Sequence, residues 1–126
     1  MKTLTQNYVI ESEHSARNLG SGEVQVLSTP SMILFMERTA RKCVEPTLVD
    51  GYVTVGTRVD VRHLRPVPIG ENLRVTARLT DIDGKRLTFG VKVEWRNIVV
   101  GEGVHERYVV NNEEFLRRLA EDQKIH

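Results

Sequence analysis

The hydrophobic pattern of this chain changes from a helical period to a period of two near residue 50, and this change constrains the fold more than any other feature. Residues 31–44 contain no glycine or proline. They follow Ser28-Thr29-Pro30, where a hydroxyl N-cap and a proline at the first helical position predict a helix. From Tyr52 onward apolar and polar residues alternate, which predicts strands. A helix followed by about four or five mostly antiparallel strands indicates an α+β fold, in which the helix buries its stripe on one sheet face.

Turn residues separate the predicted strands. In residues 52–63 the valines share one parity and one predicted face, which His63 continues: Val53, Val55, Val59 and Val61. Gly56 interrupts this strand, so it marks a bulge or a close backbone approach. Residues 73–79 and 87–95 flank Asp83-Gly84 and predict a hairpin.

The ends of the chain carry weaker signals. Residues 98–110 predict a further strand, and Tyr8–Ile10 is a candidate edge strand. Gly20-Ser21-Gly22 is typical of a loop. Asn111 and the residues after it are predicted to cap a last helix, whose narrow apolar stripe consists of Phe115, Leu116 and Leu119.

Length and composition favour one soluble domain over residues 1–126. The net charge is 18 − 17 = +1, which offers no global field for nucleic acid or an anionic membrane. No apolar run approaches the roughly 20 residues of a membrane span, and no secretory signal is evident at the start. Cys43 is the only cysteine, which excludes a disulfide scaffold and fits a reducing compartment, so we expect a cytoplasmic protein.

Glu37 occupies an unusual position for a carboxylate. At 100° per residue it falls inside the apolar arc of the predicted helix, formed by Ile33, Met36, Ala40, Cys43 and Val44. Removal of a carboxylate from water raises its pKa toward the range useful for a general base or nucleophile. The alternative is an ordinary surface pair with Arg41, four residues further along the helix.

Thr29 and His63 each have a structural and a chemical interpretation. Thr29 at the helix start is expected to act as a cap, and a cap hydroxyl lies among unpaired amides that can polarise a carbonyl. His63 on a valine face is either a satisfied core residue or, if it shares a cleft with Glu37, a proton carrier. No pair of histidines has metal-ligand spacing.

Four segments together carry a resemblance to a known family. They are residues 29–37 (TPSMILFME), Val55-Gly56-Thr57, Val61-Arg62-His63 and residues 101–107 (GEGVHER). In order and spacing the chain from about Leu27 to Tyr108 resembles the hotdog-fold acyl-CoA thioesterases, specifically the fluoroacetyl-CoA thioesterase-like branch. The fluoroacyl-selective members carry lid aromatics before the threonine, where this chain has Gly20-Ser21-Gly22-Glu23, a difference that concerns selectivity rather than hydrolysis.

The resemblance implies a hotdog fold, with an antiparallel sheet wrapped around a central helix. It also implies a homodimer with its active site at the interface, no metal or cofactor, and a catalytic set that falls on Thr29, Glu37 and His63. Gly56 matches the glycine beside the reacting carbonyl, with Thr57 next to it, whereas the match at His105 is interpreted as structural.

Several basic residues are candidates for binding the phosphates of coenzyme A, because guanidinium groups suit phosphate geometry. We expect Arg62 and Arg65 to bind substrate, and Arg58 and Lys42 are further candidates. Solvated strand faces carry such residues in any case.

A distance estimate favours a dimer. Thr29 and Glu37 are eight residues apart, which separates their backbones by about 12 Å along a helix. Antiparallel helices of two protomers would bring the start of one to the middle of the other, and a two-fold axis would create two such sites. A dimer of dimers is an open alternative.

These features predict hydrolysis of a short or small acyl-CoA thioester. Glu37 would activate water or attack the carbonyl directly, and His63 would assist proton transfer. The alternative is a non-catalytic module of the same fold that binds or senses acyl-CoA, because a fold alone does not establish activity. The chain is not expected to bind nucleic acid.

Overall fold

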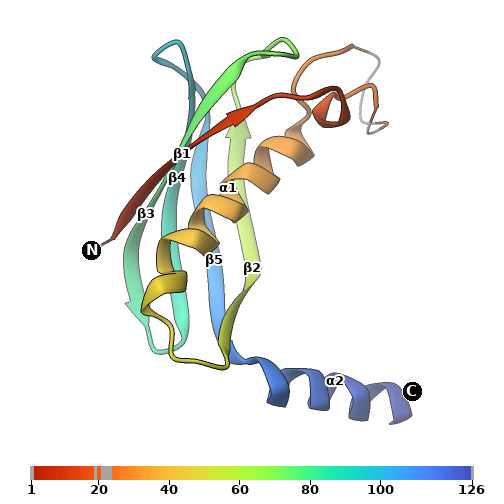
Figure 1. Ribbon diagram of the computed structural model, residues 1–126, viewed down its shortest axis with the longest axis vertical. Coiled ribbons are helices and arrows are strands. Elements are labelled where there is room, and N and C mark those ends of the chain that lie inside the picture. The colour runs from red at the N-terminus through yellow and green to blue at the C-terminus, as the bar shows by residue number, and fades with distance from the viewer. Residues whose placement is uncertain (1, 19, 21–23, 126) are drawn as a thin grey trace.

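A computed structural model of the chain describes residues 2–18, 20 and 24–125 (Figure 1). Of the predicted loop Gly20–Gly22, only Gly20 lies among the described residues. In chain order the elements are β1 (Thr3–Val9), the short 3-10 helix η1 (Ser12–His14), α1 (Thr29–Val44), the 3-10 turn η2 (Glu45–Thr47), β2 (Tyr52–His63), β3 (Asn72–Asp83), β4 (Arg86–Trp95), β5 (Ile98–Asn111) and α2 (Asn112–Ile125).

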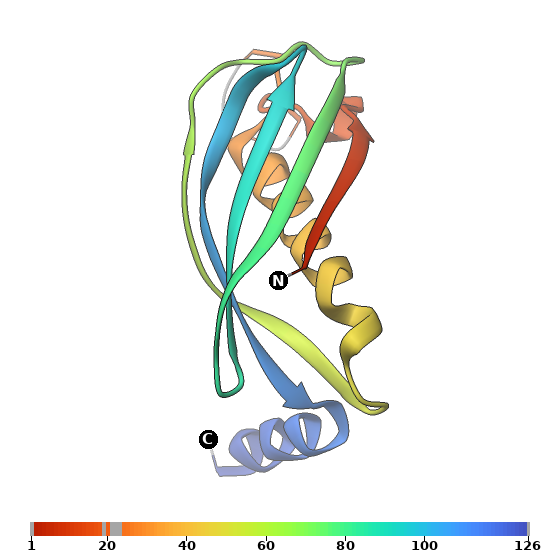
Figure 2. The same ribbon diagram turned by 90° about the vertical axis from the view of Figure 1, so that its left-hand side faces the viewer.

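The strands form one five-stranded antiparallel sheet in the order β1-β3-β4-β5-β2. The sheet curves around α1, which lies across its concave face (Figures 1 and 2). This arrangement confirms the predicted α+β architecture and the β3–β4 hairpin. The N-terminal edge strand is longer than the candidate Tyr8–Ile10 and pairs with β3 from Thr3 to Val9.

The core lies between α1 and the concave face of the sheet. Alternate residues of β3 and β4 point toward the helix, and all of them are buried: Leu73, Val75, Ala77, Leu79, Leu87, Phe89, Val91 and Val93. Phe35 of α1 stacks on Tyr8 with ring centroids 4.5 Å apart, which fixes β1 against the helix. The burial of this apolar surface is the main contribution to the stability of such a domain.

The start of α1 differs from the prediction by one residue. Ser28 is the N-cap, and its side chain accepts a hydrogen bond of 3.1 Å from the Ser31 amide. Thr29 is the first residue of the helix, so its predicted role as the cap is wrong. Because Ser28 satisfies the exposed amide, the Thr29 hydroxyl is available for another partner.

The buried face of α1 is also rotated from the predicted arc. It consists of Ser31, Met32, Phe35, Met36, Thr39, Ala40, Cys43 and Val44. Ile33 is only half-buried, and the Glu37 side chain, which is 36% exposed, lies at the margin of this face rather than within it. The helix therefore presents Glu37 at the edge of the core.

A β-bulge changes the parity of β2. The register against β5 shifts between Gly56 and Arg58, which leaves Thr57 as an extra residue. As a result Thr54 and Gly56 face the helix before the bulge, whereas Val59, Val61 and His63 face it afterwards. The predicted single valine face is wrong for Val53 and Val55, which point away from the helix, because a strand with one inserted residue exchanges its two faces. The interpretation of Gly56 as the mark of a bulge is confirmed.

The edge strand β2 and the helix α2 lie at the outside of the fold. β2 is an edge strand, with β5 on one side of it only. α2, which Asn111 caps through a 3.0 Å bond to the Glu114 amide, projects beyond the end of β5 (Figure 1). Within the described part of the chain, neither helix has the length and apolar content to cross a bilayer.

Candidate active site

The structure collects most of the predicted site residues into two clusters beside α1. We call Thr29 and His63 the helix-start cluster. We call Glu37, Gly56, His105 and Arg107 the mid-helix cluster. β2 joins the two, because Gly56 lies near its middle and His63 at its end.

The helix-start cluster is a hydrogen-bonded pair. The Thr29 hydroxyl lies 2.8 Å from Nδ1 of His63. Nε2 of His63 is buried and has no hydrogen-bond partner among the described residues. Burial lowers the pKa of His63 below its ordinary value, and this effect outweighs a backbone hydrogen bond involving Arg65 that acts in the opposite direction. The ring is therefore neutral at pH 7, with one nitrogen still free to exchange a proton.

An open hollow of about 450 Å³ adjoins this pair. Its walls come from residues before the helix and from the segment after β2, including Leu27, Leu64, Arg65 and Pro66. Arg65 thus lies beside the Thr29–His63 pair, as a contact with substrate would require.

Glu37 and Gly56 meet in the mid-helix cluster. A Cβ atom placed on Gly56 would lie 2.7 Å from Oε2 of Glu37 and 3.3 Å from the His105 ring. No side chain larger than hydrogen fits there unless the carboxylate moves. The predicted close approach at Gly56 is confirmed, and the groups that approach are the carboxylate and the two basic side chains beneath it.

Arg107 forms the floor of the cluster and is only 7% exposed. Its Nε donates to the Thr54 hydroxyl at 2.8 Å, and its Nη2 donates to the Thr54 carbonyl at 2.9 Å. Nη1 lies 3.9 Å from Oε2 of Glu37. Burial lowers the pKa of Arg107 from its ordinary value, and the charge of Glu37 opposes this. A guanidinium stays protonated at physiological pH in any case, so the floor carries a fixed positive charge.

His105 lies between Arg107 and the bulge of β2. Its Nδ1 is 2.8 Å from the Arg58 carbonyl, and its Nε2 is 3.2 Å from Nη1 of Arg107. Arg107 can only donate, so Nε2 accepts and Nδ1 carries the proton. Both neighbours therefore select one neutral tautomer of His105.

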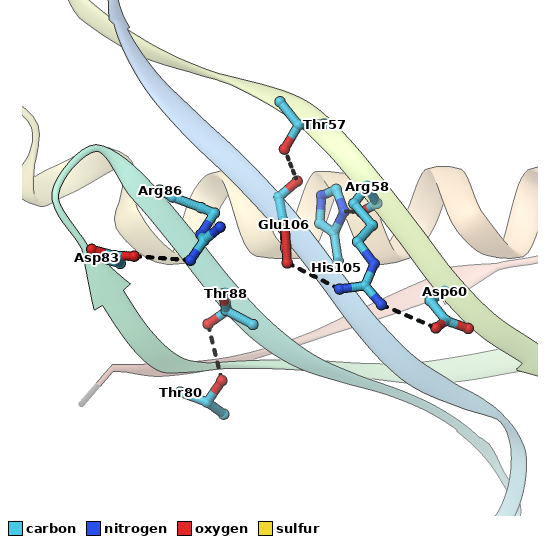
Figure 3. A network of polar contacts seen from close by, with 9 residues as sticks. All are labelled: Thr57, Arg58, Asp60, Thr80, Asp83, Arg86, Thr88, His105 and Glu106. Atoms are coloured by element: carbon cyan, nitrogen blue, oxygen red, sulfur yellow. Dashed lines mark hydrogen bonds and ion pairs between the residues drawn. The ribbon is translucent and has the colours of Figure 1, made fainter.

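Thr57 and Arg58 face the outer surface of the sheet (Figure 3). The Thr57 hydroxyl donates to the Glu106 carbonyl at 3.2 Å, and the Arg58 guanidinium contacts Glu106 and Asp60 at 3.2 and 3.3 Å. In the same strand parity, Arg62 lies on that outer face, away from the helix. These contacts hold the bulge in place, so in one chain Thr57 and Arg62 are not brought to either cluster.

The helix-start and mid-helix clusters do not meet within one chain. Thr29 and Glu37 are separated by two turns of α1, which corresponds to about 12 Å along the helix axis. The structure brings Thr29 to His63 and Glu37 to Gly56, but it does not unite the three predicted catalytic side chains.

Sequence reasoning did not find Arg107 or Thr54 and assigned His105 only a structural match. The signal for them was weak: Gly101, Gly103, His105, Arg107 and Val109 share one strand parity, but the glycines, His105 and Arg107 do not mark that face as buried. Gly101 packs against Met32 of α1, which identifies this as the helix-facing side of β5. In the described residues, no group of three or more His, Cys, Asp or Glu side chains is arranged to hold a metal ion.

Comparison with known proteins shows the family of the chain. Residues 10–113 match the family model described as fluoroacetyl-CoA-specific thioesterase. The chain belongs to this family. It is 33% identical over 97 residues to the fluoroacetyl-CoA thioesterase of Streptantibioticus cattleyicolor, an alignment that spans 77% of this chain and 70% of that protein.

Solved structures of several similar proteins share the architecture. A crystallised fluoroacetyl-CoA thioesterase superposes with a TM-score of 0.88 at 29% identity, over 94% of this chain and 93% of that one. A Thermus thermophilus protein described as a thioesterase superfamily member superposes with a TM-score of 0.86 at 28% identity, over 98% and 94% of the two chains. These matches, together with a hot-dog-like protein of Thermanaerovibrio acidaminovorans at a TM-score of 0.88, confirm the hotdog fold.

Proposed function

We propose that this chain hydrolyses a short or small acyl-CoA thioester to the free acid and coenzyme A. The observation that carries the proposal is the position of the Glu37 carboxylate, which lies directly over the bare backbone of Gly56 and beside the fixed charge of Arg107. A planar thioester carbonyl can approach a glycine backbone more closely than any other residue allows. Membership of the fluoroacetyl-CoA-specific thioesterase family supports the same reaction.

In the proposed reaction Glu37 acts on the carbonyl carbon. It either removes a proton from a water whose oxygen attacks that carbon, or attacks it directly to give an anhydride that water then opens. In both routes the carbon–sulfur bond breaks, and the proton lost by water is transferred to the coenzyme A sulfur. The chemistry needs only protein groups and water, so no metal or cofactor enters the proposal.

The helix-start cluster supplies the other half of the proposed site. Pro30 has no N–H, and Ser28 accepts from the amides of Ser31 and Met32, so the donors that this end of α1 can offer are those of Thr29 itself. The Thr29 N–H and hydroxyl would stabilise charge that develops on the carbonyl oxygen. His63, with its free Nε2, would carry the proton to the departing thiolate. Arg65 would bind a coenzyme A phosphate near this end, whereas the case for Arg62 depends on how a second chain is placed.

We propose a homodimer, formed through the edge strand β2, as the arrangement that unites the two clusters. An antiparallel pairing of two β2 strands about a two-fold axis near Asp60 would place Val59 opposite Val61 of the partner. Because of the bulge, it would also place Gly56 opposite the partner's His63. Val59 is 39% exposed on the helix-facing side of β2, and this pairing would cover it. Each dimer would then hold two composite sites, and a dimer of dimers would preserve them.

Measurement of thiol release over a panel of acyl-CoA thioesters tests the activity. We expect turnover with short acyl groups and a loss of about a hundredfold or more in Glu37→Gln. Glu45→Gln is the matched control, because Glu45 directly follows the end of α1 but is exposed and makes only a 3.9 Å pair with Arg41. If wild-type protein binds acyl-CoA without releasing thiol, the chain is a binding module of the same fold and the hydrolytic proposal is wrong.

Mixing two inactive variants tests the composite site. Thr29→Ala and Glu37→Gln homodimers each lack one half of both sites. In a statistical mixture half of the dimers are mixed and each has one intact site, so about a quarter of the wild-type activity returns. Recovery requires subunit exchange, which native mass spectrometry of tagged chains confirms. If exchange is complete and no activity returns, each active site belongs to a single chain.

A further inference from the structure

His105 makes no contact that hydrolysis requires directly, yet it is almost completely buried beside the mid-helix cluster, with 1% of its surface exposed. A buried histidine with both nitrogens engaged is a common core feature. Here, however, one of its partners is the guanidinium that lies beside Glu37. The second partner is the carbonyl of Arg58, at the residue where the bulge ends. The ring thus connects the bulge to the floor of the proposed site.

We propose that His105 is a positioning residue: in its neutral form it accepts a hydrogen bond from Arg107 and so holds the guanidinium beside Glu37, and its protonation releases Arg107. This inference rests on the proposed function, because it assigns a pH-dependent support to the same site.

The geometry explains why the proton state of His105 matters. Thr54 fixes Nε and Nη2 of Arg107, but among the described residues Nη1 is held only by Nε2 of His105 and by the longer contact with Glu37. When Nε2 gains a proton, two donors and two positive charges face each other across 3.2 Å. The hydrogen bond is then lost, and Nη1 must move.

The charges around His105 come from three elements. Burial has the largest effect and lowers the pKa of His105, and Arg107 on the same strand acts in the same direction. The hydrogen bond to the Arg58 carbonyl of β2, Glu37 of α1 and Glu106 of β5 act in the opposite direction. Because the pKa is lowered overall, the neutral form prevails at pH 7, and protonation occurs only as the solution becomes more acidic than the usual histidine range.

Two substitutions of His105 distinguish the roles of its two ring nitrogens. A glutamine side chain reaches the position of Nε2 and can accept from Arg107, but it does not titrate. An asparagine side chain reaches only the position of Nδ1, so it can donate to the Arg58 carbonyl but leaves Nη1 of Arg107 without an acceptor. Comparison of His105→Gln with His105→Asn therefore distinguishes the hydrogen bond that holds Arg107 from the hydrogen bond that holds the bulge.

The test measures kcat and KM from pH 5 to 9 for wild type, His105→Gln, His105→Asn and the control His14→Gln, whose ring contacts Glu11 and Phe35 and no member of either cluster among the described residues. We expect His105→Asn to lower kcat about tenfold or more with little change in KM. We expect His105→Gln to restore most of that loss and to shift or remove the acid limb of the wild-type kcat profile, which His14→Gln retains. An unchanged acid limb in His105→Gln, or equal losses in both variants, would overturn the proposal.

A second measurement does not depend on turnover or on the variants folding. Nitrogen-15 spectra of the histidine rings in wild type report which nitrogen bears the proton. We expect His105 to be neutral with its proton on Nδ1 at pH 7, and a resonance typical of Nε2–H would contradict the inference. If wild type shows the expected tautomer but hydrolyses no thioester, the proposed function has failed while the hydrogen bond from Arg107 to a neutral His105 stands.

Discussion

The two clusters beside α1 differ in how completely their polar groups are satisfied. In the mid-helix cluster Arg107 has partners on Thr54, His105 and Glu37, and each His105 nitrogen has its own partner. In the helix-start cluster Nδ1 of His63 pairs with Thr29, whereas its buried Nε2 has no hydrogen-bond partner among the described residues. A saturated network holds its members in one geometry, whereas an unsatisfied buried group indicates that something else completes it. The mid-helix cluster is therefore preorganised by its own chain, and the helix-start cluster is not.

Among the variants that compare the two clusters, the largest expected effect comes from Gly56→Ala, which disturbs the preorganised mid-helix cluster. The new methyl group would meet Oε2 of Glu37 at 2.7 Å, and because this is the end of a flexible side chain, the carboxylate moves and the fold survives. We expect kcat/KM for a short acyl-CoA to fall about a hundredfold with little loss of thermal stability. Gly90→Ala is the matched control, since its methyl group would have its nearest contact at 3.8 Å. Full activity in Gly56→Ala would show that the carboxylate does not need its present place.

Effects of intermediate size are expected from Ser28→Ala and Thr29→Ala, which distinguish a capping role from a catalytic role at the start of α1. Ser28→Ala removes the side chain that accepts from the Ser31 amide, and we expect the free energy of unfolding to fall by about 1 kcal/mol. Thr29→Ala leaves that cap intact but breaks the bond to His63, so we expect thiol release to fall while unfolding by denaturant changes by less than about 0.5 kcal/mol. If Thr29→Ala is the more destabilising of the two, Thr29 is a structural residue.

The smallest effect is the dependence of stability on pH. The pKa values of His63 and His105 are both lowered from 6.5 in the folded chain, so the unfolded chain binds protons first as the pH falls. The free energy of unfolding therefore carries no contribution from these groups above about pH 7, and it decreases from about pH 6.5 down to the lowered folded pKa values. Denaturant titrations at several pH values measure this slope.

His63→Gln and His105→Gln show how much each histidine contributes to the pH dependence of the free energy of unfolding. We expect each variant to flatten part of the slope below about pH 6.5. We also expect His105→Gln to flatten it more, because the His105 side chain is the more deeply buried of the two. An equal slope in wild type and both variants would mean that other groups carry the acid sensitivity.

The sequence predicted the architecture and several members of the site because the signals for them are local. Three signals in the sequence each depend on the backbone preference of nearby residues alone. They are the proline after Ser28-Thr29, the alternation of polar and apolar residues in β3 and β4, and the glycine at position 56. Nearby residues do not decide whether Ser28 or Thr29 is the N-cap of α1. Both hydroxyls suit the position, and the contact of Thr29 with His63 is made across the fold.

The parity of β2 and the role of β5 were harder to predict. An alternating pattern shows which residues share a face only while the strand is regular, and the bulge at Thr57 reverses that relation halfway along β2. In β5, Gly101 and Gly103 lack the apolar side chains that would have marked the helix-facing side. For that reason His105 and Arg107 could not be identified as buried.

The bulge in β2 also fixes the number of residues between Gly56 and His63, because both must face the helix. If Thr57 were deleted, either Gly56 or His63 would turn to the solvent side of the sheet, because a strand has only two faces. Substitution at position 57 leaves this spacing intact, whereas loss or gain of one residue between Thr54 and His63 does not. This segment should therefore tolerate changes of side chain far better than changes of length, although its middle is exposed at the rim of the sheet.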